Sequence, residues 1–219
     1  MTTVTIDSAV KARCPRVALG CLTASVRAQA TPPGLEDELR LCEQKILQLP
    51  EPRSILESAP VLLTRSAYKA LGKDPARYRG SAEALIRRVI AGKGLPRIHA
   101  VVDIINVVSV ESRLPIGLYD LAHVQGGITF RAGRPGETYK GIGKYDLNLE
   151  HLPLFADELG PHGSATSDSE RTMVTLETKN ILAIFVSFGG LENLERYAER
   201  MKALLTEHAS ATDFRHVIV

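Results

Sequence analysis

The sequence predicts an α+β fold. Helical apolar patterns dominate the first half of the chain, whereas glycines and short apolar runs typical of strands dominate the second half. The two kinds of element do not alternate regularly, as they would in a parallel α/β fold. With 219 residues, 44% of them apolar, the chain is long enough to bury a sizeable core as one domain.

The N-terminal part of the chain predicts one strand and one long helix. Val17–Leu22 is an apolar run typical of a buried strand, and Thr31–Gly34 then breaks the chain. The following apolar residues are spaced by 4, 3, 4 and 3 positions, which places them on one face of a helix. They are Leu35, Leu39, Cys42, Ile46 and Leu49. This stripe suits the core of the domain and the face of a dimer equally well.

Three more helices are expected before the middle of the chain. Pro60–Leu71 forms one and ends at Gly72. The next has Ser81 as its predicted N-cap and Gly92 at its C-terminal end. Ile98–Val110 is richly apolar, and we interpret it as a helix because Asp103 and Asn106 then share one face.

The second half predicts strands and a final helix. The predicted strands are Ile128–Arg131, Thr172–Thr178 and Asn180–Phe188, the last of them a central strand because it is almost wholly apolar. Gly189 and Gly190 then turn into a helix, and a short closing strand follows. The apolar face of that helix comprises Leu191, Leu194, Tyr197, Met201 and Leu204. The closing strand carries the alternating residues Phe214, His216 and Ile218.

Several classes of protein are excluded by what the sequence lacks. No apolar run is long enough to span a membrane, and residues 1–7 do not resemble a secretory signal. The three cysteines form no CxxC pair, which favours a reducing, cytoplasmic location. The six histidines show no metal-binding spacing, and the glycines match neither a P-loop nor a dinucleotide fingerprint. We therefore expect no metal and no cofactor.

Positive charge is concentrated in one segment. Residues 65–97 hold nine basic and two acidic residues, a net charge of +7, whereas the other 186 residues hold 18 basic and 23 acidic ones, a net charge of −5. A local basic patch is typical of a protein that binds a phosphate-rich partner. A solvated helix face is the alternative, because cations near a helix C-terminus are also favoured by the helix dipole.

Three polar segments are candidate sites. Arg113–Asp120 combines a cation, a proline, a glycine, an aromatic ring and a carboxylate, although a rigid turn capped by Asp120 would need the same residues. Gly126–Glu137 is a glycine-rich sheet edge. Ser164–Thr172 holds five hydroxyls, two acids and an arginine, which suit a ligand-binding loop or a flexible polar loop.

Five stretches together resemble the B3/B4 domain family, which includes the tRNA-editing domain of the bacterial phenylalanyl-tRNA synthetase beta subunit and free-standing proteins. They are Tyr78–Arg88, Val102–Asn106, Leu114–Asp120, Gly136–Glu137 and Glu177–Ile181. The resemblance covers residues 68–189, with residues 1–60 and 190–219 as extensions. It implies a compact, layered α+β fold, with helices packed on a mainly antiparallel sheet, and a pocket that hydrolyses the ester of a wrongly charged tRNA.

The resemblance departs from the synthetase motif at two positions. Gly117 stands where the synthetase has histidine, and Ile184 stands where it has a glutamate that helps recognise the hydroxyl of tyrosine. The amino acid that this chain would remove is therefore left open. Hydrolysis needs no protein nucleophile, because the ester is already activated and the protein need only orient a water and stabilise the oxyanion.

We predict the following roles. The catalytic residues are Asn106, Gly117, Asp120 and Thr178. The substrate-binding residues are Arg113, Pro115, Tyr119, Gly127, Arg131, Glu137, Ser164, Thr166, Asp168 and Arg171. The RNA-binding residues are Arg77, Arg79, Arg87, Arg88 and Lys93. The expected partner is tRNA, with no membrane partner. A non-catalytic RNA-binding module and a pocket for a free amino acid or related metabolite are the alternatives.

Overall fold

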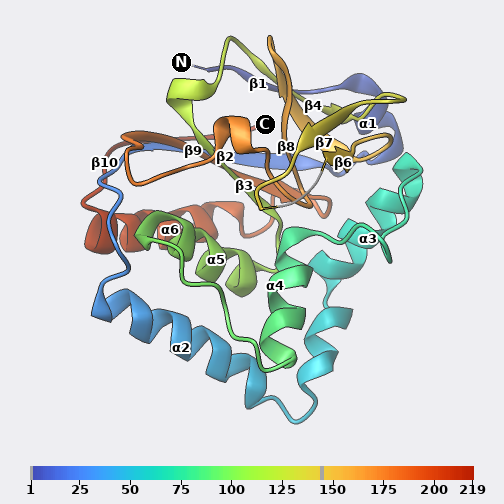
Figure 1. Cartoon of the computed structure of the whole chain (residues 1–219). Coiled ribbons are helices and arrows are strands. Elements are labelled where there is room, and N and C mark those ends of the chain that lie inside the picture. The colour runs from blue at the N-terminus through green and yellow to red at the C-terminus, as the bar shows by residue number, and fades with distance from the viewer. Residues whose placement is uncertain (1, 144–145) are drawn as a thin grey trace.

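The computed structural model of the chain describes residues 2–143 and 146–219 and arranges them in three layers (Figure 1). A four-stranded sheet lies in the middle, a second four-stranded sheet covers one of its faces, and helices cover the other. A small hairpin, β5 (Thr138–Lys140) with β6 (Asp146–Asn148), contacts the second sheet. The predicted layered α+β fold is confirmed.

The central sheet is antiparallel throughout. Its order is β10 (Thr212–Ile218), β2 (Ala18–Ser25), β9 (Asn180–Ser187) and β3 (Ile116–Asp120). The predicted central strand, β9, lies inside this sheet, and its residues 181–186 are all buried. Because side chains alternate along a strand, β9 contributes to the core on both faces of the sheet.

The second sheet and two helices enclose the core on one face of the central sheet. The sheet order is β1 (Val4–Ile6), β4 (Ile128–Ala132), β7 (Pro153–Asp157) and β8 (Gly160–Ser164). Strands β1 and β4 are parallel, and the other pairs are antiparallel. The helices are α1 (Ser8–Arg13) and α3 (Ala59–Leu71), whose buried residues join the same core.

Four helices cover the opposite face of the central sheet (Figure 1). They are α2 (Pro33–Leu47), α4 (Ser81–Ile90), α5 (Ala100–Ser112) and α6 (Leu194–Ala209). The α2 stripe of Leu35, Leu39, Cys42 and Ile46 is buried in this core, so it is a core face rather than a dimer face. Three short 3₁₀ helices complete the description: η1 (Pro52–Glu57), η2 (Leu121–His123) and η3 (Glu170–Thr172).

Three local predictions are wrong. The N-cap of α4 is Gly80, and Ser81 is already helical, because the Ser81 amide donates to the Ala165 carbonyl at 2.8 Å. The segment 172–178 is not a strand; η3 and a turn closed by Thr178 occupy it. Leu191 precedes α6 and is 62% exposed, because the helix starts three residues later than the apolar pattern suggested.

Candidate functional site

An aromatic ring fills the space that two glycines leave open at the free edge of β3. Tyr119 lies on the same face of β3 as Gly117, and Gly163 faces it from β8. A Cβ at position 117 would overlap the Tyr119 hydroxyl and lie 2.7 Å from Cζ, and a Cβ at 163 would lie 2.6 Å from that Cζ. The ring is fully buried and makes an edge contact with His162, with centroids 4.6 Å apart. Both glycines are therefore required by the packing of Tyr119.

The Tyr119 hydroxyl fastens the polar segment 164–168, which we call the hydroxyl loop, to this edge. It donates to Asp168 Oδ1 at 3.1 Å, and the Leu118 amide donates to Asp168 Oδ2 at 3.1 Å. The Ser164 amide donates to the same carboxylate at 3.3 Å, and Ser164 Oγ donates to the Ser167 carbonyl at 2.7 Å. The loop is therefore shaped and rigid rather than flexible.

Two further tyrosines hold the hydroxyl loop from other elements. Tyr68 Oη of α3 lies 2.9 Å from Thr166 Oγ1, and Tyr139 Oη of β5 donates to the Ser167 carbonyl at 2.5 Å. Burial raises the pKa of both phenols, so each remains a neutral donor. Thr166 and Ser167 remain partly exposed, and within the described part of the chain Ser167 Oγ has no hydrogen-bond partner. The loop thus presents two accessible hydroxyls on a fixed backbone.

Two of the predicted catalytic residues meet, and a third does not join them. Thr178 Oγ1 donates to Asp120 Oδ2 at 2.6 Å, and Asp120 Oδ1 accepts from the Ala122 amide at 2.9 Å. Both residues are buried, and Asp120 caps η2, as the rigid-turn alternative supposed. Asn106 lies on α5, partly buried, and its side chain forms no hydrogen bond with the described residues. Gly117 pairs with Ile184 of β9 and leaves no space for a ligand in front of it.

Two predicted substrate-binding arginines are already held by carboxylates. Arg131 forms a bidentate pair with Glu137, with contacts of 2.7 and 2.8 Å. Arg171 binds Asp157 at 2.8 and 3.0 Å and also donates to two backbone carbonyls. Because bidentate pairs occupy the guanidinium fork, a ligand at either arginine would compete with a good partner.

Of the remaining predicted residues, Arg113 and Pro115 line one small gap, and Gly127 lies elsewhere, before β4. Pro115 is buried beside Gly80, and Gly127 is exposed before β4. Arg113 follows the last turn of α5 with a left-handed backbone, φ 61°, and its Nε is buried without a partner among the described residues.

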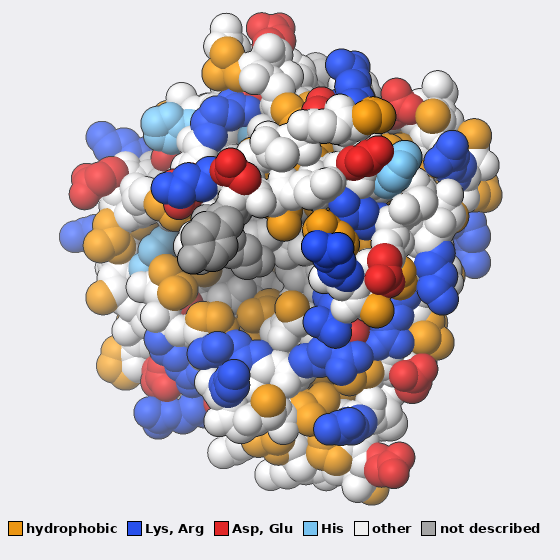
Figure 2. Space-filling model, turned by 45° about the vertical axis from the view of Figure 1, so that its right-hand side comes forward, with side chains coloured by type: hydrophobic (Ala, Val, Ile, Leu, Met, Phe, Trp, Pro, Cys, Tyr) orange, Lys and Arg blue, Asp and Glu red, His pale blue; other side chains and the backbone are white. Residues whose placement is uncertain are grey.

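The basic segment forms a face centred on one buried carboxylate. Glu83 of α4 is only 4% exposed and accepts from Arg65 at 2.9 Å and from Arg87 at 2.7 Å. Burial raises the pKa of its carboxyl, but the hydrogen bonds from the two arginines outweigh burial and lower the pKa overall. The predicted RNA-binding residues Arg77, Arg79, Arg87, Arg88 and Lys93 are all exposed. Figure 2 shows lysine and arginine side chains gathered on this side of the molecule, below a hollow.

The hydroxyl loop is joined directly to the basic face. The Ser81 amide at the start of α4 donates to the Ala165 carbonyl of the loop, only two residues before Glu83. A Cβ at Gly80 would lie 3.1 Å from Thr64 and 3.2 Å from Pro115, so α3, α4 and the chain before β3 converge there.

The sequence assigns no site role to Tyr68 or Tyr139, whereas Ser167 and Arg65 lie within the predicted segments 164–172 and 65–97 without a role of their own. Tyr68, Tyr139 and Ser167 hold or form the hydroxyl loop, and Arg65 completes the Glu83 cluster. No sequence spacing links the tyrosines to the loop, because α3 and β5 approach it only through the tertiary fold. The Glu83–Arg87 pair did carry a signal, since residues four apart on a helix are neighbours.

His162 predicts a pH dependence of stability. It is completely buried, its Nε2 has no partner among the described residues, and burial lowers its pKa from 6.5 to about 4. In the unfolded chain this histidine is protonated below pH 6.5, whereas in the folded chain it stays neutral down to about pH 4. Stability is therefore complete above pH 6.5 and falls by about 3 kcal/mol as the pH drops to 4.

Urea unfolding of the native chain and of His162→Phe at several pH values checks this expectation. The difference in unfolding free energy between the two proteins should change between pH 6.5 and 4 and be constant above that window. A constant difference over the whole range would mean that His162 titrates normally in the folded chain.

The metal-binding, membrane-spanning and thiol chemistry of the described residues bears on the kind of site. In residues 2–143 and 146–219, no group of three or more His, Cys, Asp or Glu side chains could hold a metal ion. No helix in those ranges is long and apolar enough to cross a membrane. Cys14, Cys21 and Cys42 are free and buried, and burial raises the pKa of Cys21 and of Cys42 to about 12, so neither is an activated thiolate.

Comparison with known proteins identifies the family. A family model described as the B3/4 domain matches residues 63–210, more than half of the chain. The chain belongs to the B3/4 domain family. The match includes most of α3, the basic face, β3, the hydroxyl loop and all of α6.

Curated relatives that carry this domain are phenylalanine–tRNA ligase beta subunits. The chain is 32% identical over 125 residues to that of Ralstonia nicotianae, an alignment that covers 56% of this chain and 15% of the relative. It is 38% identical over 80 residues to that of Chromobacterium violaceum, covering 36% of this chain and 10% of the relative. The chain therefore spans a small part of the length of the curated relatives it matches.

A solved structure supports the fold. An N-terminal fragment of the phenylalanyl-tRNA synthetase beta subunit from Pyrococcus horikoshii matches 100% of this chain and 54% of the fragment, with a TM-score of 0.53 and 16% identity. The B3/4 domain here is thus related to a domain of tRNA synthetases in both sequence and fold.

Proposed function

We propose that this B3/4 domain binds the 3′ end of a tRNA and hydrolyses the ester bond of a wrongly attached amino acid. The observation that carries the proposal is the direct link between the rigid hydroxyl loop and the basic face, through the Ser81 amide and the Ala165 carbonyl. A substrate with a phosphate backbone and a small polar end matches this arrangement. The family relationship to the synthetase beta subunits supports the same substrate class.

The chemistry requires positioning rather than a protein nucleophile. A water oxygen attacks the ester carbonyl carbon, the bond to the ribose oxygen breaks, and the ribose oxygen takes up a proton from the water. In this proposal the hydroxyls of Thr166 and Ser167, both partly exposed residues, donate to the developing oxyanion, and the three tyrosines that bind the loop support it by holding the loop in one shape. Asn106, Gly117, Asp120 and Thr178 remain proposed contributors, with the Asp120–Thr178 pair acting by fixing the end of β3.

A deacylation panel tests the proposal. Purified protein is mixed with tRNAs charged with each of the twenty amino acids, and loss of the ester is followed against a control without protein. We expect rapid loss from one or two species. If no charged tRNA is hydrolysed, the proposed activity is wrong, and salt-dependent binding of uncharged tRNA would then favour the non-catalytic RNA-binding alternative.

Matched variants then test the loop. Thr166→Val removes the hydroxyl while keeping the shape of the side chain, and we expect it to lower the rate about tenfold or more. Tyr68→Phe removes one hydrogen bond that holds the loop but leaves both loop hydroxyls, so it should lower the rate less than Thr166→Val does. Equal losses in both variants would mean that Thr166 acts through loop structure alone.

For the buried pair, Thr178→Ser should keep more activity than Thr178→Ala, because serine retains the hydroxyl that binds Asp120.

A further inference from the structure

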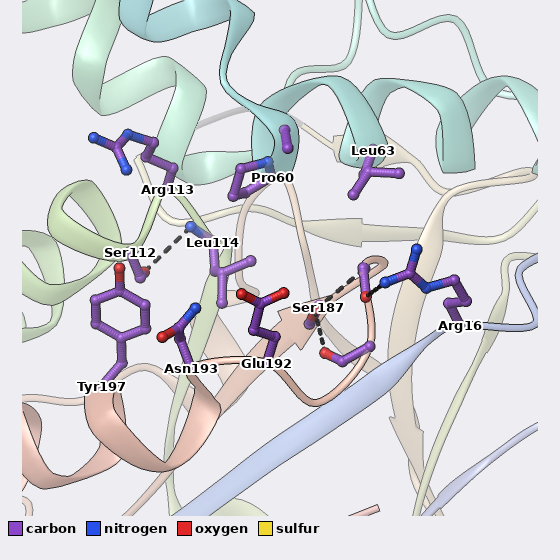
Figure 3. Close-up of a pocket in the computed structure, with 13 residues that line it drawn as sticks. Arg16, Pro60, Leu63, Ser112, Arg113, Leu114, Ser187, Glu192, Asn193 and Tyr197 are labelled. Atoms are coloured by element: carbon purple, nitrogen blue, oxygen red, sulfur yellow. Dashed lines mark hydrogen bonds between the residues drawn. The ribbon is translucent and has the colours of Figure 1, made fainter.

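Two hollows meet on the side of the molecule where α5 ends and α6 begins. One, of about 370 Å³, lies between the start of α3, the end of α5 and the loop before α6 (Figure 3). The other, of about 430 Å³, lies between α2, α5 and α6. Arg113 and Tyr197 line both hollows, which we together call the α5–α6 groove. Figure 3 shows Tyr197 and Arg113 on either side of Ser112.

Arg113, at the junction of the two hollows, has no ion pair among the described residues and has a left-handed backbone. Among the described residues, no carboxylate lies within salt-bridge distance of Arg113, and its buried Nε has no acceptor. Its backbone is left-handed at the position that ends α5, where glycine is the residue that fits without strain. An arginine is therefore present at a position where the backbone favours glycine, and its charge is left without a partner.

The groove as a whole is positively charged. Its lining includes five cations, Arg16, Lys45, Arg113, Arg196 and Arg200, against two carboxylates, Glu111 and Glu192. Arg200 is occupied by Glu38 and Glu111, whereas Lys45 and Arg196 are exposed and have no ion pair within the part of the chain described. The groove also offers the ring of Tyr197. The Arg196 guanidinium lies over this ring, with its Cζ 5.9 Å from the ring centroid. Cations beside an aromatic ring are typical of surfaces that bind single-stranded nucleic acid.

Arg113 links the groove to the basic residues of α4. It also lines a small internal gap with the buried residues Glu83 and Pro115, and Glu83 is the carboxylate that binds Arg65 and Arg87. The cations of the groove therefore lie next to the positive cluster of α4. An isolated pocket would suit a small anion, whereas an extended surface of this kind suits a polyanion.

We propose that the α5–α6 groove binds a single-stranded RNA segment, with phosphates on Lys45, Arg113 and Arg196 and a base against Tyr197. The inference rests on the proposed function, because the strand would be part of the tRNA whose end is presented to the hydroxyl loop. It assigns RNA contacts to α2, α5 and α6, outside the segment 65–97 that the sequence singled out.

Fluorescence anisotropy with uncharged tRNA and with a labelled single-stranded RNA of about twelve nucleotides tests the groove. Lys45→Glu/Arg196→Glu should weaken both complexes about tenfold and reduce the dependence of affinity on salt. Arg113→Gly should weaken binding several-fold without lowering the melting temperature, because glycine suits the left-handed backbone. The matched control is Lys11→Glu/Lys179→Glu, which reverses two exposed charges that line neither hollow and should bind within about twofold of the native chain.

The outcomes separate this inference from the proposed function. Groove variants that bind like the native chain, or control variants that weaken as much as the groove variants, would overturn the groove assignment whatever the deacylation panel shows. A native chain that binds neither RNA would overturn it as well. If the groove variants lose binding while the native chain hydrolyses no charged tRNA, the groove assignment stands and the proposed hydrolysis fails.

Discussion

Gly117→Ala is expected to destabilise the fold by about 3 kcal/mol or more and to lower the melting temperature by roughly 6–12 °C. The new Cβ would overlap the Tyr119 hydroxyl and lie 2.7 Å from Cζ. The ring has no room to withdraw, because Gly163 and the His162 ring enclose its other sides and Asp168 holds its hydroxyl. A methyl group at this position is therefore overpacked.

Thermal unfolding of a double-mutant cycle isolates this contact. Tyr119→Leu alone should also destabilise, because it leaves a cavity, but Gly117→Ala/Tyr119→Leu should cost much less than the sum of the single changes. Gly127→Ala is the matched control, since a Cβ there meets nothing closer than 3.7 Å, and its melting temperature should be almost unchanged. If Gly117→Ala has the same melting temperature as the native chain, the described packing of Tyr119 is wrong.

This packing also explains the departure from the synthetase motif at position 117. A side chain of any size at 117 would collide with Tyr119 in this chain. The Tyr119 hydroxyl instead reaches the space beside Gly117 and binds Asp168 of the hydroxyl loop. Restoring a histidine at 117 would therefore require shortening Tyr119 at the same time.

Arg171→Ala is expected to cost about 3–5 kcal/mol, because it leaves a buried charge without its partner. The Asp157 side chain is completely buried, and Arg171 supplies a bidentate pair to it. The same guanidinium donates to the carbonyls of His123 and Gly160, which joins η3 to η2 and to the turn between β7 and β8. Arg171→Lys should recover part of the loss, since lysine keeps the charge but not the fork.

Urea unfolding at several pH values distinguishes this structural role from a role in ligand binding. Burial raises the pKa of Asp157, but the hydrogen bonds from Arg171 and the Gln125 amide outweigh burial, so the pKa lies below 3.8 and the pair stabilises the fold above that pH. Without Arg171, burial would raise the pKa of Asp157. The cost of burying the unpaired carboxylate would then disappear as the carboxyl takes up a proton at low pH. The difference in unfolding free energy between the native chain and Arg171→Ala should therefore become smaller as the pH falls. An unchanged stability at pH 7 would mean that Arg171 is free to bind a ligand.

The sequence predicted the elements that depend on local pattern. The α2 stripe, the glycine end of α3 and the apolar strand β9 were all evident from spacing and composition, because burial of one face imposes a fixed period. The start of α4 was misplaced by one residue, since the Ser81 amide is bound by a carbonyl 84 positions away. The strand predicted at 172–178 failed for a similar reason: Thr178 binds Asp120 and closes a turn.

By itself, the sequence determined the α+β class, the positive segment at 65–97 and the resemblance to the B3/B4 family, because composition, periodicity and motif order are properties of the chain. Only the tertiary structure decided what the charged and polar candidates contact. It paired Arg131 and Arg171 with carboxylates, placed Tyr119 in the space beside Gly117, and set the hydroxyl loop against α4. Buried polar groups take partners that are distant in sequence, and no local pattern records those partners.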